Sequence, residues 1–496
     1  MQKKQTILVV ASLLVVVLSV TLAYFTAQII GKGKIVTINS ADLKIIFTDS
    51  DGSISGTNIE PGKWNVTKTF TIENKSNETY KYNIVIQDLV NTFVTNGYLQ
   101  YKITSTNNGY NMTKFKDVPK SETATDTILA YSVSISVGVT QSYTVEFKYA
   151  NDESVDQSND MGKKLSGTLF ITEGTEDPNK TLYNQLLVDK STKLTRTDFS
   201  KVLTDNNTNT LYTGVEDSKT VYYFAGNATD NWVKFGKNAS NQDLYWRIIR
   251  TNSDGSVRLL YHGTSTTTTD AYIGTSAFNS SYDNIAYVSY MYGSLGSISS
   301  ARENTNNSTI KTTIDNWYIS NLEAKGYTKY LSTTAVYCND RSISSDSINF
   351  GAFTRLGTNK TPSYDCAATE DKFTVDTSTG NGKLTYPIAL MTADEVSFAG
   401  GLYGANTPTW YYYNSVNGSS TGSKFWWLLS PLDSSTSGSS MFIVRGSSNP
   451  GRLNYNYVYS NNGVRPALSL KSCVKYSSGD GSANEPYTIK ETETGC

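Results

Sequence analysis

Histidine is almost absent from this sequence, and neither acidic nor basic side chains are in excess. The 496 residues contain one histidine, His262, and 43 basic side chains against 44 acidic ones. Zinc sites built on several histidines are therefore excluded, and a Ser-His-Asp or Cys-His catalytic group has only His262 to use. His262 ends the strand-like run 259–263, so we interpret it as a strand residue and not as a catalyst. The balanced charge indicates no nucleic-acid partner.

Cysteine is scarce as well. Cys338, Cys366, Cys473 and Cys496 all lie in the last third of the chain. None belongs to a CxxC pair, which argues against a zinc ribbon or a thioredoxin-like motif. Four cysteines allow three pairings, and proximity in the sequence favours Cys338–Cys366 and Cys473–Cys496. We therefore predict two disulfides in an exported protein, with no metal site and no cofactor.

The N-terminus carries a long apolar run. Lys3 and Lys4 precede an apolar stretch over residues 7–25. This pattern predicts a signal peptide or a transmembrane anchor over residues 1–30. The length of the run favours an anchor because it matches the thickness of a bilayer. A signal peptide stays open as the alternative, and both interpretations place the rest of the chain outside the cell, at its surface if the membrane anchor is retained.

Short alternating runs separated by turns fill residues 35–173 and predict an all-β sandwich. Part of this region resembles exported β-sandwich proteins of the biofilm-matrix and camelysin type. The resemblance rests on Thr21–Thr26, Leu43-Lys44-Ile45, Pro61-Gly62 and Phe70–Asn74. It implies the same fold for about the first 170 residues and assigns no functional residue.

A linker with a short helix is predicted over residues 174–205. Asp177 is placed to cap the helix, Pro178 to occupy its first turn, and Leu182, Leu186 and Leu187 form its apolar stripe.

The pattern changes after this linker. A hairpin with Asp254-Gly255 at its tip, a helix behind Ser308 and a capping box at Thr392 predict an α+β domain over residues 206–471. A turn-rich tail, residues 472–496, follows and is closed by the second disulfide.

Two motifs near the C-terminus are typical of a domain scaffold. They are Phe425–Pro431, with the sequence FWWLLSP, and Gly463–Leu470, with the sequence GVRPALSL. Trp426 and Trp427 offer large apolar surfaces, and Arg465 can clamp backbone carbonyls or a carboxylate.

Between these motifs the composition shifts. Eleven of the sixteen residues 447–462 are Ser, Asn or Tyr. Tyrosine provides contact area at low entropic cost while Ser and Asn adapt their hydrogen bonds, which is the residue usage of binding loops. We predict a loop-like ligand-binding surface with both its tyrosines and its asparagines exposed; a polar edge hairpin is the alternative. The predicted binding residues are Asp433, Ser434, Ser435, Ser447, Ser448, Asn449, Asn454, Tyr455, Asn456, Tyr457, Tyr459, Asn461 and Asn462.

The two scaffold motifs resemble the C-type-lectin-like domains that also occur in relatives of formylglycine-generating enzymes. They look especially like the variable proteins of diversity-generating retroelements. The resemblance implies a fixed scaffold over about residues 210–471, on which mutagenesis of Asn codons varies exposed positions. It does not imply formylglycine-generating activity, because the cysteines of this chain do not match that active site.

These observations predict a multidomain protein, an N-terminal all-β sandwich plus a C-terminal α+β C-type-lectin-like domain. The predicted function is that of an exported cell-surface protein, not an enzyme, which binds a protein or glycan ligand. Two alternatives stay open: a structural matrix or filament protein, and an enzyme that acts on surface polymers with a pair of carboxylates.

Overall fold

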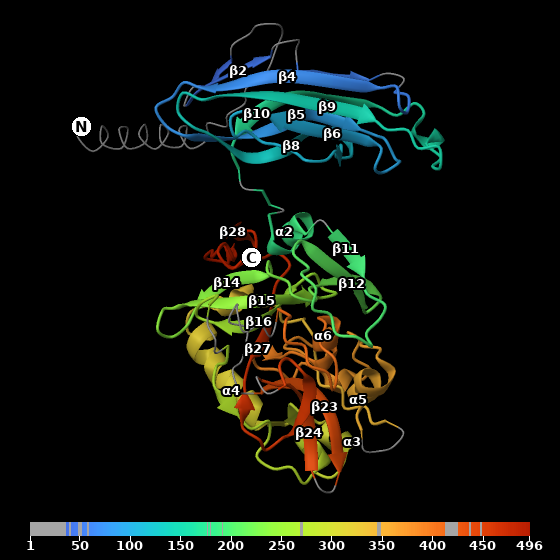
Figure 1. The fold of residues 1–496 in the computed structure, drawn as a ribbon. Coiled ribbons are helices and arrows are strands. Elements are labelled where there is room, and N and C mark those ends of the chain that lie inside the picture. Colours follow the sequence, from blue (N-terminus) through green and yellow to red (C-terminus); the bar gives the residue numbers. More distant parts are fainter. Residues whose placement is uncertain are drawn as a thin grey trace, which may run out of the picture. The chain divides into compact units, whose positions relative to one another are not determined.

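The chain divides into two compact units, with the boundary between Pro178 and Asn179. The structure is a computed structural model (Figure 1). It describes residues 36–38, 41–47, 52–56, 59–175, 177–178, 180–190, 192–267, 271–344, 349–411, 425–435, 438–446 and 449–496, with backbone alone for the first two segments. The predicted signal peptide or anchor, residues 1–30, lies outside the described residues.

The first unit is a β-sandwich. In its described residues one sheet has the order β1 (Val36–Ile38), β2 (Ala41–Phe47), β4 (Asn65–Asn74), β9 (Thr140–Tyr149), β6 (Leu99–Ser105) and β7 (Lys116–Asp117). The other has the order β3 (Ser53–Gly56), β10 (Leu165–Glu173), β5 (Tyr80–Asn91) and β8 (Ser121–Ile135). Side chains from both sheets, such as Ile72, Ile84 and Phe147, are buried in one common core. The sandwich predicted from alternating runs is confirmed.

The longest strand of this unit, β8, is not predicted from the sequence. Its first half, residues 121–126, has the sequence SETATD and is almost entirely solvent-exposed. These residues show no apolar alternation, yet they pair with β5, Ser121 with Asn91 and Thr125 with Leu89. Strand pairing here comes from the partner strand and not from burial of a hydrophobic face.

The second unit contains two larger sheets. In the described part, one sheet has the path β11 (Thr192–Thr195), β12 (Thr210–Glu216), β13 (Lys219–Tyr223), β15 (Asp243–Thr251), β14 (Trp232–Lys237), β29 (Tyr487–Ile489) and β28 (Tyr476–Ser478). It continues from β15 through β16 (Val257–Gly263) and β27 (Pro466–Leu470) to β22 (Ile388–Leu390). The other has the order β17 (Thr275–Ser276), β26 (Asn462–Gly463), β23 (Trp426–Ser435), β24 (Gly438–Val444) and β25 (Leu453–Tyr457). The β15–β16 hairpin confirms the turn predicted at Asp254-Gly255.

Short helices accompany these sheets. They include α2 (Leu182–Asp189), α3 (Ile298–Ala301), α4 (Thr309–Tyr318), α5 (Gly351–Phe353) and α6 (Ala393–Phe398). The predicted caps Ser308 and Thr392 are confirmed, and the second forms a complete capping box with Glu395. The predicted cap of the first helix is wrong: α2 is capped by Thr181, whose hydroxyl accepts the N–H of Asn184, and not by Asp177. Pro178 therefore precedes the helix. The Thr181 hydroxyl lies closer to the apolar stripe than Asp177 does, and it accepts the free N–H group of the first turn.

The segments on either side of residues 206–471 belong to the same unit. Helix α2 and strand β11 lie at its beginning, and β28 and β29 of the predicted tail pair into the ten-stranded sheet through β14. The Lys190 ammonium forms a buried ion pair with Asp230 at 2.9 Å and donates to the carbonyl of Asp480 at 3.1 Å. The Tyr487 hydroxyl donates to Asp189 at 2.8 Å. These contacts join the start of the unit to its C-terminal end.

Both predicted disulfides are confirmed. Cys338–Cys366 and Cys473–Cys496 have Cα–Cα distances of 5.7 Å and 5.6 Å. Such bonds persist outside the reducing cytosol, which indicates a protein that is not cytoplasmic. None of the helices in the described part of the chain has the length and apolar character needed to cross a bilayer.

The two cores predict independent folding. A chain that comprises residues 179–496 should melt in one cooperative transition. Its hydrophobic core and the buried Lys190–Asp230 ion pair both lie within those residues. Differential scanning calorimetry of this fragment and of the full chain makes the comparison. A fragment without a transition, beside a full chain that melts normally, would place the boundary elsewhere.

Candidate recognition surface

Trp426 and Trp427 lie in the core of the second unit, as expected for the scaffold residues that the sequence predicts. Both begin β23, and neither exposes any of its surface. The Trp427 indole donates to the carbonyl of Ser276 at 2.8 Å, and its ring meets Phe278 edge-on. The predicted clamp also forms: the Arg465 guanidinium donates to the carbonyl of Tyr261 and lies 4.7 Å from the Trp426 ring centroid.

The predicted binding residues lie at the end of β23, in the connection between β24 and β25, on β25, and in the turn from β25 to the first residue of β26. Figure 1 shows β23 and β24 at the end of the second unit away from α2 and β28. Among these residues, Ser435, Tyr455, Tyr457, Tyr459 and Asn461 are exposed. Asp433, Asn449, Asn454 and Asn456 are half-buried, whereas Ser434 and Asn462 are buried. Ser447 and Ser448 lie outside the described residues.

Exposed aromatic side chains gather at one place. Of the aromatic residues that the structure describes, four have exposed side chains: Tyr282, Tyr455, Tyr457 and Tyr459, at 43, 39, 44 and 49% of their full accessibility. The rings of Tyr457 and Tyr459 are nearly parallel with centroids 5.8 Å apart, and Tyr459 lies 4.8 Å from Tyr282. We call Tyr282, Tyr455, Tyr457 and Tyr459 the tyrosine cluster.

Tyr282 is the member of the cluster that sequence reasoning misses. It lies more than 170 residues before Tyr455 in the chain, in a serine-rich turn that resembles many others in this sequence. Gly438 helps bring the rings together, because a Cβ there would lie 2.9 Å from the Tyr457 ring and 3.9 Å from that of Tyr282. A larger residue at this position would displace the Tyr457 ring.

The expectation that residues 454–457 form a loop with both sets of side chains exposed is wrong. They form a regular antiparallel strand in register with β24, Tyr455 opposite Phe442 and Asn456 opposite Met441. The Asn454 and Asn456 amide oxygens accept the N–H groups of Tyr455 and Tyr457 at 2.8 and 3.0 Å. Half-burial of these asparagines is therefore possible without a ligand, because the backbone of their own strand supplies the hydrogen bonds.

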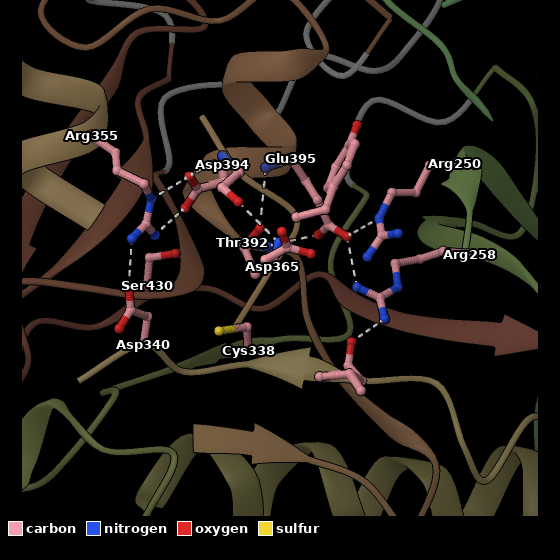
Figure 2. A pocket seen from close by; sticks show the side chains of 13 residues that line it. Arg250, Arg258, Cys338, Asp340, Arg355, Asp365, Thr392, Asp394, Glu395 and Ser430 are labelled. Atoms are coloured by element: carbon pink, nitrogen blue, oxygen red, sulfur yellow. Dashed lines mark hydrogen bonds and ion pairs between the residues drawn. The ribbon is translucent and has the colours of Figure 1, made fainter. Parts of the chain in front are cut away.

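A small cavity elsewhere in the unit is lined by three arginines and four acids (Figure 2). Arg250 and Arg258 both donate to one Glu395 oxygen, at 2.9 and 2.7 Å. On its other side Arg355 donates twice to Asp394, at 3.0 Å each, and once to Asp340 at 2.6 Å. The water-accessible space is about 20 Å³, enough for one water molecule.

Two acids of this cavity, Glu395 and Asp340, are ionised partners of arginine. Burial alone would raise the pKa of Glu395, but the charges of Arg258 and Arg250 hold it at about 2. Burial likewise opposes ionisation of Asp340, and the Arg355 charge outweighs it and lowers that pKa. The arrangement connects α6 to β15 and β16, beside the Cys338–Cys366 disulfide, and its chemistry is that of a buried ion-pair network.

His262 is buried in the core at the end of β16. Its ring meets Trp232 edge-on at 4.4 Å, and neither ring nitrogen has a hydrogen-bond partner among the described residues. Burial and the nearby charges of Arg465 and Arg247 lower its pKa well below the ordinary value. The imidazole is therefore neutral in the folded protein, in keeping with the interpretation of His262 as a strand residue.

Comparison of the chain with protein-family models, with curated proteins and with solved structures finds no match. The arrangement of the residues themselves is therefore the basis for any statement about function. In the described part of the chain, no group of three or more His, Cys, Asp or Glu side chains is placed to hold a metal ion.

The contrast between scaffold and surface gives a stability prediction. Trp427→Ala should lower the free energy of unfolding by about 3–5 kcal/mol, because it removes a fully buried ring. Tyr457→Ala should change it by about 0.5 kcal/mol or less, because that ring is largely in water. Denaturant titration of both variants measures the difference, and equal losses would show that Tyr457 belongs to the core.

His262 predicts a pH dependence of stability. The unfolded chain takes up a proton as the pH falls through about 6.5, whereas the folded protein, with its lowered pKa, does not. The free energy of unfolding should therefore fall below about pH 6.5, by up to about 1.4 kcal/mol per pH unit, until the folded pKa is reached. Denaturant titrations between pH 7.5 and 5 should show a smaller loss for His262→Phe. Parallel curves for the two proteins would contradict the buried neutral imidazole.

Proposed function

We propose that this chain is an exported cell-surface protein that binds a ligand through the tyrosine cluster. The proposal depends on one observation: the exposed aromatic side chains of the described residues all belong to this one surface. Exposed aromatics carry binding energy because they lose water readily and lose little conformational freedom on contact.

Two further features support this function. β24, which pairs with β25, lies at the end of its unit away from α2, the first helix of the unit (Figure 1). The sheet that contains β25 is anchored in the core, because the buried Trp426 and Trp427 begin β23, which pairs with β24; this limits the cost of ordering the surface on binding. A C-type-lectin-like scaffold, an N-terminal membrane anchor and variation of exposed positions within about residues 430–465 by a retroelement belong to the same proposal. A neighbouring reverse transcriptase gene with an adenine-substituted repeat of these codons tests the last element.

Cell binding tests the proposed function. Fluorescently labelled full-length protein is incubated with a panel of intact bacterial and epithelial cells, and bound protein is measured by flow cytometry. We expect saturable binding to at least one cell type and a loss of about tenfold or more in affinity for the Tyr457→Ala/Tyr459→Ala variant. Leu295→Ala is the matched control, because Leu295 is 51% exposed and lies outside the cluster. Absence of binding across the panel, or equal binding by all variants, would refute the proposal.

A further inference from the structure

The free edge of β25 is closed to an added strand. β25 is the last strand of its sheet in the described residues. The N–H of Val458 donates to Ser439 at 3.1 Å and the carbonyl of Arg452 accepts from Arg445 at 2.9 Å. The backbone of the even-numbered residues therefore faces β24, and that of Tyr455 and Tyr457 faces the free edge.

Side chains and the following turn bond the N–H groups of both tyrosines and the carbonyl of Tyr457. The N–H groups of Tyr455 and Tyr457 donate to the amide oxygens of Asn454 and Asn456, as described above. The carbonyl of Tyr457 accepts the N–H of Ser460 at 2.9 Å. A peptide that paired with this edge would have to break these bonds, so a ligand meets rings, hydroxyls and amides instead of backbone.

The strand and turn that carry three of the four tyrosines are also neutral. No residue from Leu453 to Val464 carries a formal charge, and the polar side chains there include asparagine amides and a serine hydroxyl. Two acids lie close by: Asp283, which follows Tyr282, and Asp433, which pairs with Ser440 opposite Tyr457. Arg452, which directly precedes β25, donates to the side chain of Asn406 at 2.9 Å. An anionic ligand would lose its water here and meet the carboxylates of Asp283 and Asp433, so the surface suits a ligand without negative charge.

We propose that the tyrosine cluster binds neutral carbohydrate, with sugar rings packed on the tyrosines and sugar hydroxyls bonded to the surrounding amides. This inference rests on the proposed function and names its class of ligand. A pyranose ring presents weakly positive C–H groups on its face, which complement the negative face of an aromatic ring. Its hydroxyls both donate and accept, as does the side-chain amide of the exposed Asn461.

Affinity electrophoresis of the full-length protein tests the ligand class. Native gels contain laminarin, mannan or xyloglucan as neutral polysaccharides, or polygalacturonate as an anionic one. We expect at least one neutral polysaccharide to retard the protein. The Tyr457→Ala/Tyr459→Ala variant should migrate freely or bind about tenfold more weakly, while Tyr457→Phe/Tyr459→Phe keeps most of the retardation because it keeps the rings. Thermal melts of both variants confirm that they are folded.

Three results would overturn the inference. They are no retardation by any of the three neutral polysaccharides, equal retardation of wild type and the alanine variant, and retardation by polygalacturonate alone. Cell binding separates this failure from failure of the proposed function. If cells bind the wild type but not the alanine variant, and protease treatment of the cells abolishes binding, the ligand is a protein and only the carbohydrate inference falls.

Discussion

The segment Asn462–Leu470 connects the two sheets of the second unit, and the position of the recognition surface depends on it. Its first two residues form β26 beside β23, and its last five form β27 between β16 and β22. Arg465 lies at the crossing, where it donates to the carbonyl of Tyr261 at 3.3 and 3.2 Å and covers Trp426. One short stretch of chain thus fixes the sheet that carries the tyrosines relative to the sheet that contains the main core.

Charged side chains form ion pairs in the interior of the second unit, whereas the tyrosines of the recognition surface are uncharged. Arg250, Arg258 and Glu395 are nearly inaccessible, and each is bonded to a partner of opposite charge. Removing one member would leave another charge buried without compensation, which is far more costly than loss of a surface pair. The near-zero net charge therefore conceals a set of matched buried pairs, while the tyrosine cluster is left uncharged.

Tyrosine serves two purposes in this chain, and its surroundings decide which. Tyr290 and Tyr337 are buried in the core, whereas Tyr457 extends from a strand at the edge of a sheet and Tyr459 from the turn that follows it. The same residue can pack in a core or present a binding surface because it joins a large apolar ring to a polar hydroxyl. Composition alone cannot separate these roles, since 35 tyrosines occur along the chain.

Local patterns in the sequence determined the sandwich, the β15–β16 hairpin, the caps at Ser308 and Thr392, and both disulfides. They also identified Trp426, Trp427 and Arg465 as scaffold, because large apolar side chains and turn residues are readable from neighbours alone. Only the tertiary structure decided that Tyr282 joins the cluster, that Glu395 bonds two arginines, and that Asn454 and Asn456 bond their own strand. Each of these depends on strand pairing or on contacts between residues more than a hundred positions apart. The hydrophobic periodicity of one segment does not identify the segment with which it pairs.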